Sequence, residues 1–160
     1  MSKELNFLLL GESGSGKSTT INALANYFRF GEFDEVNETA ESLIEVIPSL
    51  FTLPDPENGG KELEIASNFI SSNERQEYGR SATSEPTGYC FTFGYDSHVL
   101  RIIDTPGIGD TDGVEADKQN MENIFLFLQT IELLHGIIII VNGTESRHSL
   151  QFKFCILELL

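Results

Sequence analysis

Short apolar runs and apolar residues at helical spacing alternate along the start of the chain. Residues 5–10 form an apolar run that ends at Gly11, which predicts a short buried strand. Apolar residues then recur at i, i+3, i+4 and i+7 over residues 21–28, which predicts an amphipathic helix. The chain therefore opens with a strand, a glycine-rich loop and a helix.

The second half of the chain resumes this alternation. Two β-rich runs, residues 89–95 and 98–104, are separated by a tight turn and predict a hairpin. Apolar residues on one face predict a helix from about residue 115 to residue 134. The following phenylalanines have helical spacing and are core candidates: Phe125, Phe127, Phe152 and Phe154.

Two further elements close the pattern. The uncharged run of residues 137–141 predicts a buried strand, and an apolar stripe through Leu150, Phe154 and Leu157 predicts a third helix. The strand carries neither charge nor proline, the usual protections of a sheet edge. If it lies at an edge, we expect the chain to be poorly soluble or to dimerise through it.

An acidic insertion over about residues 31–80 interrupts the pattern. Residues 31–77 contain 12 acidic and two basic side chains, three prolines and the pair Gly59-Gly60. We expect at most a short helix near residues 40–47, with loop elsewhere. The insertion is either a solvated loop or a docking surface for a partner.

Charge and composition exclude several classes of protein. The 160 residues carry 10 basic and 25 acidic side chains, a net charge of −15, and no basic patch, which argues against nucleic-acid binding. No apolar run approaches the roughly 18 residues of a membrane span, and the N-terminus does not resemble a signal peptide. The two cysteines and three separated histidines fit no metal spacing. We expect a single domain in the cytoplasm.

The strongest chemical signal is the string GESGSGKS, residues 11–18, which matches G-x-x-x-x-G-K-[ST] between a strand and a helix. Backbone N–H groups of such a loop solvate phosphates, with the positive end of the helix behind them. Lys17, expected to be solvated in the empty loop, would reach the β- and γ-phosphates, and the Ser18 hydroxyl would bind Mg²⁺. The alternative is a glycine-rich turn that binds nothing. The candidate nucleotide-binding residues are Gly11, Ser13, Gly14, Ser15, Gly16, Lys17, Ser18 and Thr19.

A second signal, Asp104-Thr105-Pro106-Gly107, follows an apolar strand. A carboxylate at the end of a strand beside the loop can hold Mg²⁺ through a water, and the Gly107 N–H can meet a γ-phosphate. The alternative is an ordinary β-turn.

Together these motifs resemble the GTPase branch of the P-loop proteins, in which an Asp-x-x-Gly motif opens switch II. The string RIIDTPGIGDTDG, residues 101–113, is similar to the septin-like and AIG1-like (immunity-associated) GTPases. The resemblance covers residues 5–30 and 80–160, and it implies that a switch I threonine completes the Mg²⁺ shell. Thr83 and Thr87 are the candidates, and Thr83 is preferred because it leaves room for a strand before Asp104. Either could instead be an ordinary residue at the start of a strand.

Two departures from the family pattern affect function. A Ras-like enzyme has a glutamine shortly after its Asp-x-x-Gly motif, and this glutamine orients the attacking water; here Ile108 follows Gly107 instead. The sequence therefore shows no catalytic base, and we expect hydrolysis to be slow or partner-assisted. The guanine-reading Asn-Lys-x-Asp motif does not occur in the sequence, so guanine specificity is implied by the resemblance alone.

Chain length accounts for the missing motif. Without residues 31–77, 113 residues remain, enough for about four strands and three helices. Family members have six strands, so residues 1–160 are expected to be part of a GTPase domain. The expected fold is α/β, a three-layer, doubly wound P-loop NTPase with a mostly parallel sheet and one antiparallel strand.

Together with the resemblance, which alone implies guanine, these motifs predict Mg²⁺-dependent binding of GTP and slow or partner-assisted hydrolysis to GDP, with Lys17 and Thr83 as the catalytic candidates. The metal ligands would be Ser18, Thr83 and Asp104. A non-catalytic interaction module is the first alternative, and an ATP-binding P-loop protein is the second. Guanine nucleotide is the expected partner, together with a second copy of the chain.

Overall fold

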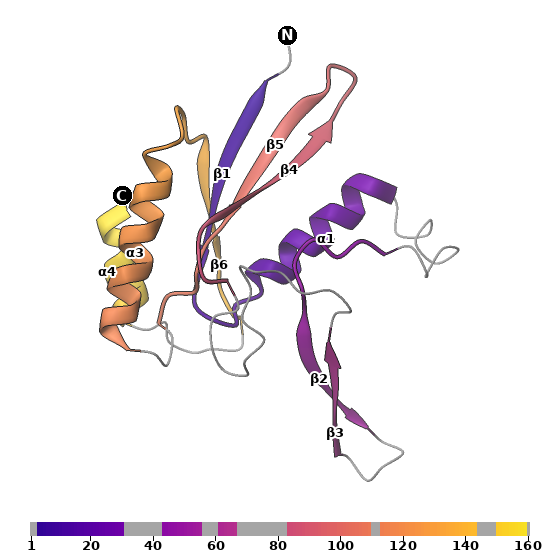
Figure 1. The fold of residues 1–160 in the computed structure, drawn as a ribbon, viewed down its shortest axis with the longest axis vertical. Helices are drawn as coiled ribbons and strands as arrows, with labels where there is room; N and C mark the ends of the chain where they lie inside the picture. Colours follow the sequence, from indigo (N-terminus) through magenta and orange to yellow (C-terminus); the bar gives the residue numbers. More distant parts are fainter. Residues whose placement is uncertain are drawn as a thin grey trace.

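A computed structural model describes residues 3–30, 43–55, 61–66, 83–109, 113–143 and 150–159. The elements follow one another as β1 (Glu4–Gly11), α1 (Lys17–Phe30), β2 (Leu50–Asp55), β3 (Lys61–Ala66), β4 (Thr87–Phe93), β5 (His98–Asp104), α3 (Val114–Leu128), β6 (Gly136–Ile140) and α4 (Leu150–Leu159) (Figure 1). None of the helices in this described part of the chain has both the length and the apolar character that a bilayer span needs.

Four strands form a mixed sheet in the order β4-β5-β1-β6. β1 pairs in parallel with β5 on one side and with β6 on the other, whereas β4 is antiparallel to β5. The predicted hairpin of two β-rich runs is therefore confirmed, as is a sheet that is parallel except for one strand. Because β1 and β5 are parallel neighbours, their C-terminal ends lie at the same edge of the sheet.

Helices cover both faces of this sheet (Figure 1). Side chains alternate along β1: Leu8 and Leu10 are buried with α3 and α4, whereas Leu9 is buried with α1. This alternation follows from the two-residue period of a strand, and it explains why residues 7–10 are apolar without interruption. The protein is an α/β structure with helices on both faces of a four-stranded sheet.

The helix predicted over residues 115–134 ends earlier, at Leu128. The chain that follows it bonds to β1 instead: Asn6 Nδ2 donates to Leu133 O at 3.0 Å, and the His135 N–H donates to Asn6 O at 2.8 Å. These tertiary hydrogen bonds replace further helical ones. The apolar stripe alone could not reveal them.

The acidic insertion contains a hairpin where loop was expected. β2 and β3 pair antiparallel, with Phe51 opposite Ile65 and Leu53 opposite Leu63, and form a separate two-stranded sheet. Figure 1 shows this hairpin projecting away from the four-stranded sheet. Apolar and acidic residues alternate along β3, which is a strand pattern that the prolines and high charge obscured.

The short helix expected near residues 40–47 is also absent from its described part, residues 43–47; residues 40–42 lie outside the described part of the chain. Two side chains of α1 hold this segment by its backbone. Asn22 Oδ1 accepts hydrogen bonds from the backbone N–H groups of residues 46 and 47. Asn26 Oδ1 accepts a hydrogen bond from the N–H of Ile44, and Asn26 Nδ2 donates one to the Ile44 carbonyl oxygen. These bonds satisfy backbone groups that a helix would have used internally.

Burial differs from expectation at three places. β6 was predicted to be buried, yet Ile139 is 45% exposed, because β6 is the last strand of the sheet order. In α4, Phe152 and Cys155 face the core, whereas Leu157, which was expected in the apolar stripe, is 71% exposed. Of the core candidates in α3, Phe127 packs against the core but Phe125 is exposed.

Candidate functional site at the C-terminal ends of β1 and β5

The glycine-rich loop, residues 11–18, leads from the end of β1 into the first turn of α1. Gly14 and Gly16 have φ angles of 74° and 98°, which side chains rarely adopt, so the loop requires glycine at both positions. Thr19 is exposed on the first turn of α1. The first N–H groups of any helix lack partners within it, and here they lie at the loop. The sequence therefore builds a backbone that can accept an anion.

Lys17 is held inside this loop rather than solvated. Its side chain is only 7% exposed, and Nζ donates to the carbonyl oxygens of Gly11 and Glu12 at 3.1 Å each. The expectation of a solvated lysine was wrong, because the loop's own carbonyls replace water around the ammonium group. The positive charge is thereby fixed at the loop.

Three oxygen-bearing side chains meet beside Lys17. Thr83 Oγ1 donates to Asp104 Oδ2 at 2.8 Å, and the Ser18 hydroxyl also lies close enough to stabilise the Asp104 carboxylate. Thr83 comes from the segment before β4, Asp104 from the end of β5 and Ser18 from α1. The fold thus brings together the residues that the sequence predicts as metal ligands.

The carboxyl group of Asp104 is fully buried. Burial raises its pKa above the ordinary value, and the Thr83 hydrogen bond, the charge of Lys17 and donors from Thr105 and Ser18 offset this only in part. Its second oxygen, Oδ1, is buried with no hydrogen-bond partner in the described structure. A buried carboxylate with an unpaired oxygen beside two hydroxyls suits a hard cation such as Mg²⁺, which prefers oxygen ligands.

Residues 107–109 pack directly against the loop. Ser13 N donates to Ile108 O at 3.2 Å, and Ile108 N donates to Gly11 O at 3.3 Å. A Cβ at Gly107 would lie 2.7 Å from Ser13 Cα, so only glycine fits there. The backbone of Gly107 is therefore held against the glycine-rich loop.

Comparison with the models of known protein families found no match, and no curated protein was found with a similar sequence.

The other threonine candidate has a different environment. Thr87 begins β4 and lies opposite Asp104 in the hairpin register, but its hydroxyl donates to Glu85 O at 3.2 Å. Thr83 is 4% exposed, and its hydroxyl bonds to the carboxylate itself. The geometry thus favours Thr83.

Sequence reasoning missed three residues that shape the site. Thr105 Oγ1 donates to Leu9 O at 2.7 Å and ties the end of β5 to β1. Asp117 and Asn120, on α3, bond to the backbone of Gly109 and Gly107. One signal could have revealed Asp117: a carboxylate four residues before Met121 lies on the apolar face of the predicted helix.

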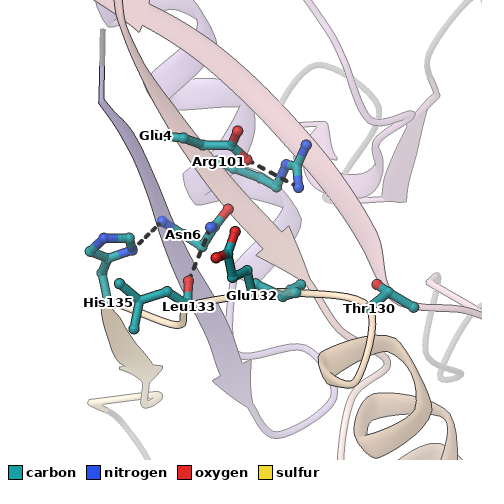
Figure 2. Close-up of a pocket in the computed structure, with 8 residues that line it drawn as sticks. Glu4, Asn6, Arg101, Thr130, Glu132, Leu133 and His135 are labelled. Atoms are coloured by element: carbon teal, nitrogen blue, oxygen red, sulfur yellow. Dashed lines mark hydrogen bonds and ion pairs between the residues drawn. The ribbon is translucent and has the colours of Figure 1, made fainter. Parts of the chain in front are cut away.

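A cavity of about 660 Å³ lies elsewhere, toward the N-terminal end of β1 (Figure 2). Arg101 and Glu4 form an ion pair across it at 3.1 Å, and Asn6 donates to Leu133 O. Asn6, the lining residue of β1 nearest the loop, lies five residues of strand before Gly11, about 16 Å at 3.3 Å per residue. The cavity is therefore remote from the glycine-rich loop and shares no residue with it. Its lining residues are Glu4, Asn6, Arg101, Thr130, Ile131, Glu132, Leu133 and His135.

Proposed function

We propose that this protein binds GTP together with Mg²⁺ at the glycine-rich loop and acts as a cytoplasmic nucleotide switch of the septin-like and AIG1-like type. The observation that carries the proposal is the meeting of Ser18, Thr83 and Asp104 beside a buried lysine. These residues lie on three separate segments of the chain, so an ordinary glycine-rich turn would not require their convergence. Hydroxyl and carboxylate oxygens beside a lysine are what a metal–triphosphate site needs.

Each residue has a defined task in this proposal. The N–H groups of the loop and the Lys17 ammonium bind phosphate oxygens, and the Gly107 N–H binds the γ-phosphate. Ser18, Thr83 and Asp104 would hold Mg²⁺, with Asp104 acting through a water. The metal would neutralise charge on the β- and γ-phosphate oxygens. Guanine rather than adenine follows only from the resemblance to the two GTPase families.

Hydrolysis of the β–γ bond is expected to be slow in the isolated protein. The side chain after Gly107 is Ile108, which is fully buried in the core and has no polar atom to orient a water. A rate useful to a cell would then need a group from a partner, worth roughly 10³ to 10⁵ in related systems. The same observation favours the second candidate function, a module that binds nucleotide without hydrolysing it.

A second copy of the chain is the proposed protein partner. β6 ends the sheet order; Ile139 within it is 45% exposed, and Val141, which follows it, is 51% exposed. An exposed apolar strand at an edge readily pairs with another strand. Association through β6 is therefore part of the proposal.

A competition titration tests the proposed function. Fluorescent GTP is displaced by GTP, GDP or ATP, with and without Mg²⁺, in the wild type, Lys17→Ala and Ser18→Ala. We expect GTP to compete best, Lys17→Ala to lose most affinity, and Ser18→Ala to bind triphosphate without the tightening by Mg²⁺. Equal competition by ATP would indicate an ATP-binding protein. Binding in Lys17→Ala at the wild-type level would refute the site.

A further inference from the structure

Residues 107–109 are hydrogen-bonded on two sides. On one side, Ile108 exchanges backbone hydrogen bonds with the loop, to Ser13 and Gly11. On the other side, two side chains of α3 bond to the residues flanking Ile108: Gly109 N donates to Asp117 Oδ1 at 2.8 Å, and Asn120 Nδ2 donates to Gly107 O at 3.2 Å. The segment is thus clamped between the loop and α3.

Asp117 is an unusual residue for its position. It lies in the first turn of α3 on the face that carries Met121 and Ile124, and it is only 4% exposed. Its second oxygen, Oδ2, is buried with no hydrogen-bond partner in the described part of the chain. Burying a carboxylate whose hydrogen-bonding capacity is only half used costs stability. An apolar side chain at this position would stabilise the core more, so core packing does not explain why residue 117 is an aspartate.

The hydrogen bond that Asp117 accepts from the Gly109 N–H explains the aspartate. Gly107 must present its N–H toward the γ-phosphate position, and a diphosphate has no group there. A segment that is already ordered loses less conformational entropy when the triphosphate binds. Side chains that fix residues 107–109 from behind therefore favour triphosphate over diphosphate without touching either.

We propose that Asp117 and Asn120 are positioning residues that set the preference of the loop for a nucleoside triphosphate over a diphosphate. The proposal rests on the proposed function, because it assumes that the loop binds nucleotide. It adds that discrimination between the two nucleotides depends on α3 through two hydrogen bonds to residues 107–109.

The test compares Kd for GTP and GDP, with Mg²⁺, in the wild type and in Asn120→Ala and Asp117→Ala. Each variant is expected to reduce the ratio Kd(GDP)/Kd(GTP) about fivefold, the size of one lost net hydrogen bond. GDP affinity itself should stay unchanged. Asp117→Asn keeps an oxygen that can accept from Gly109 and should restore the ratio.

Gln119→Ala is the matched control. Gln119 lies on the exposed side of the same helix, and its side chain bonds to Asn123. Amide hydrogen exchange of Ile108 and Gly109 without nucleotide gives a second readout: it should be faster in both alanine variants and unchanged in the control. Asn120→Ala keeps the test usable if Asp117→Ala does not fold, because Asn120 is only partly buried.

The outcomes separate this proposal from the proposed function. A wild type that prefers GTP, with variants that keep its full ratio, overturns the role of Asp117 and Asn120 alone. Unchanged amide exchange in both variants overturns the clamp itself. A wild type that binds neither nucleotide overturns the proposed function and this inference with it, whatever the exchange rates show.

Discussion

The hydroxyl of Thr83 donates a 2.8 Å hydrogen bond to the carboxylate of Asp104, and both side chains are buried. This bond joins the segment that enters β4 to the end of β5, the two strands of one hairpin. The hairpin thereby places a hydroxyl and a carboxylate together beside the loop. Substitutions at either end should affect both stability and metal-dependent binding.

Thr83→Ala should destabilise the protein by about 1–3 kcal/mol, because it leaves the buried Asp104 carboxylate without this donor. It should also abolish the tightening of GTP binding by Mg²⁺. Thr87→Ala is the control, since that hydroxyl donates to the backbone oxygen of the exposed residue Glu85, and the substitution should cost less than about 1 kcal/mol. Urea denaturation and GTP titrations measure both effects. A larger effect in Thr87→Ala on metal dependence would reassign the switch threonine.

Asp104→Asn should stabilise the ligand-free protein at neutral pH while removing its response to Mg²⁺. Burial raises the pKa of Asp104 in the folded chain, so the folded state binds more protons than the unfolded state above the ordinary value of about 4. The free energy of unfolding contributed by this group therefore falls as the pH rises through that window to the raised pKa. Asp104→Asn has no ionisable group at this position, so its free energy of unfolding does not fall for this reason.

Calorimetry without metal or nucleotide checks the pH prediction. The difference in Tm between Asp104→Asn and the wild type should grow as the pH rises from 4 toward 7. A difference that is constant across this range would show that the carboxyl is not destabilised by burial. A protein can retain such a destabilised group where function requires it.

Much of the fold could be predicted because its signals are local. The alternation along β1 and the helical spacing in α1 need only neighbouring residues, and the glycines of the loop mark the connection. The end of α3 depends instead on bonds from Asn6 to Leu133 and His135, more than 120 positions away in the chain. No local pattern carries that information.

The site shows the same division. Ser18 and Asp104 are predictable from their motifs. The preference for Thr83 over Thr87 rests only on the number of residues before Asp104, which leaves room for a strand, and it agrees with the observed hydrogen bond between Thr83 and Asp104. Asp117 and Asn120 were missed because they act on backbone groups 8 and 13 residues away along the chain, through a contact that only the packing of α3 creates. The carboxylate of Asp117 on an apolar helix face was the one visible sign.

Gly107→Ala should destabilise the protein by about 1–3 kcal/mol, the usual cost of overpacking. The added Cβ would lie 2.7 Å from Ser13 Cα and 2.9 Å from Ser13 N, and neither backbone atom can move without disturbing the loop. Gly143→Ala is the matched control, because a Cβ there meets nothing within 4 Å and should change stability by less than about 0.5 kcal/mol. Chemical denaturation distinguishes the two. Equal stability of both variants would mean that residues 107–109 do not pack against the glycine-rich loop.

The exposed edge of β6 should make the protein self-associate. β6 pairs with β1 along one side, and in the described structure no strand pairs with its other side. Ile139 is exposed there and belongs to neither core cluster, so Ile139→Lys should leave the fold intact. A charge at a strand edge opposes pairing, and the dissociation constant should rise at least about tenfold, equivalent to about 1.4 kcal/mol.

Sedimentation equilibrium over a range of protein concentrations measures this association. Leu126→Lys serves as the control, because it adds the same charge at an exposed apolar position on α3 rather than at the sheet edge. We expect the wild type and Leu126→Lys to gain mass with concentration and Ile139→Lys to stay monomeric. A wild type that is monomeric at high concentration, with a single cooperative melting transition, would show that the β6 edge is protected. The apolar run of residues 137–141 would then have to be explained by core packing alone, although Ile139 and Val141 are about half exposed.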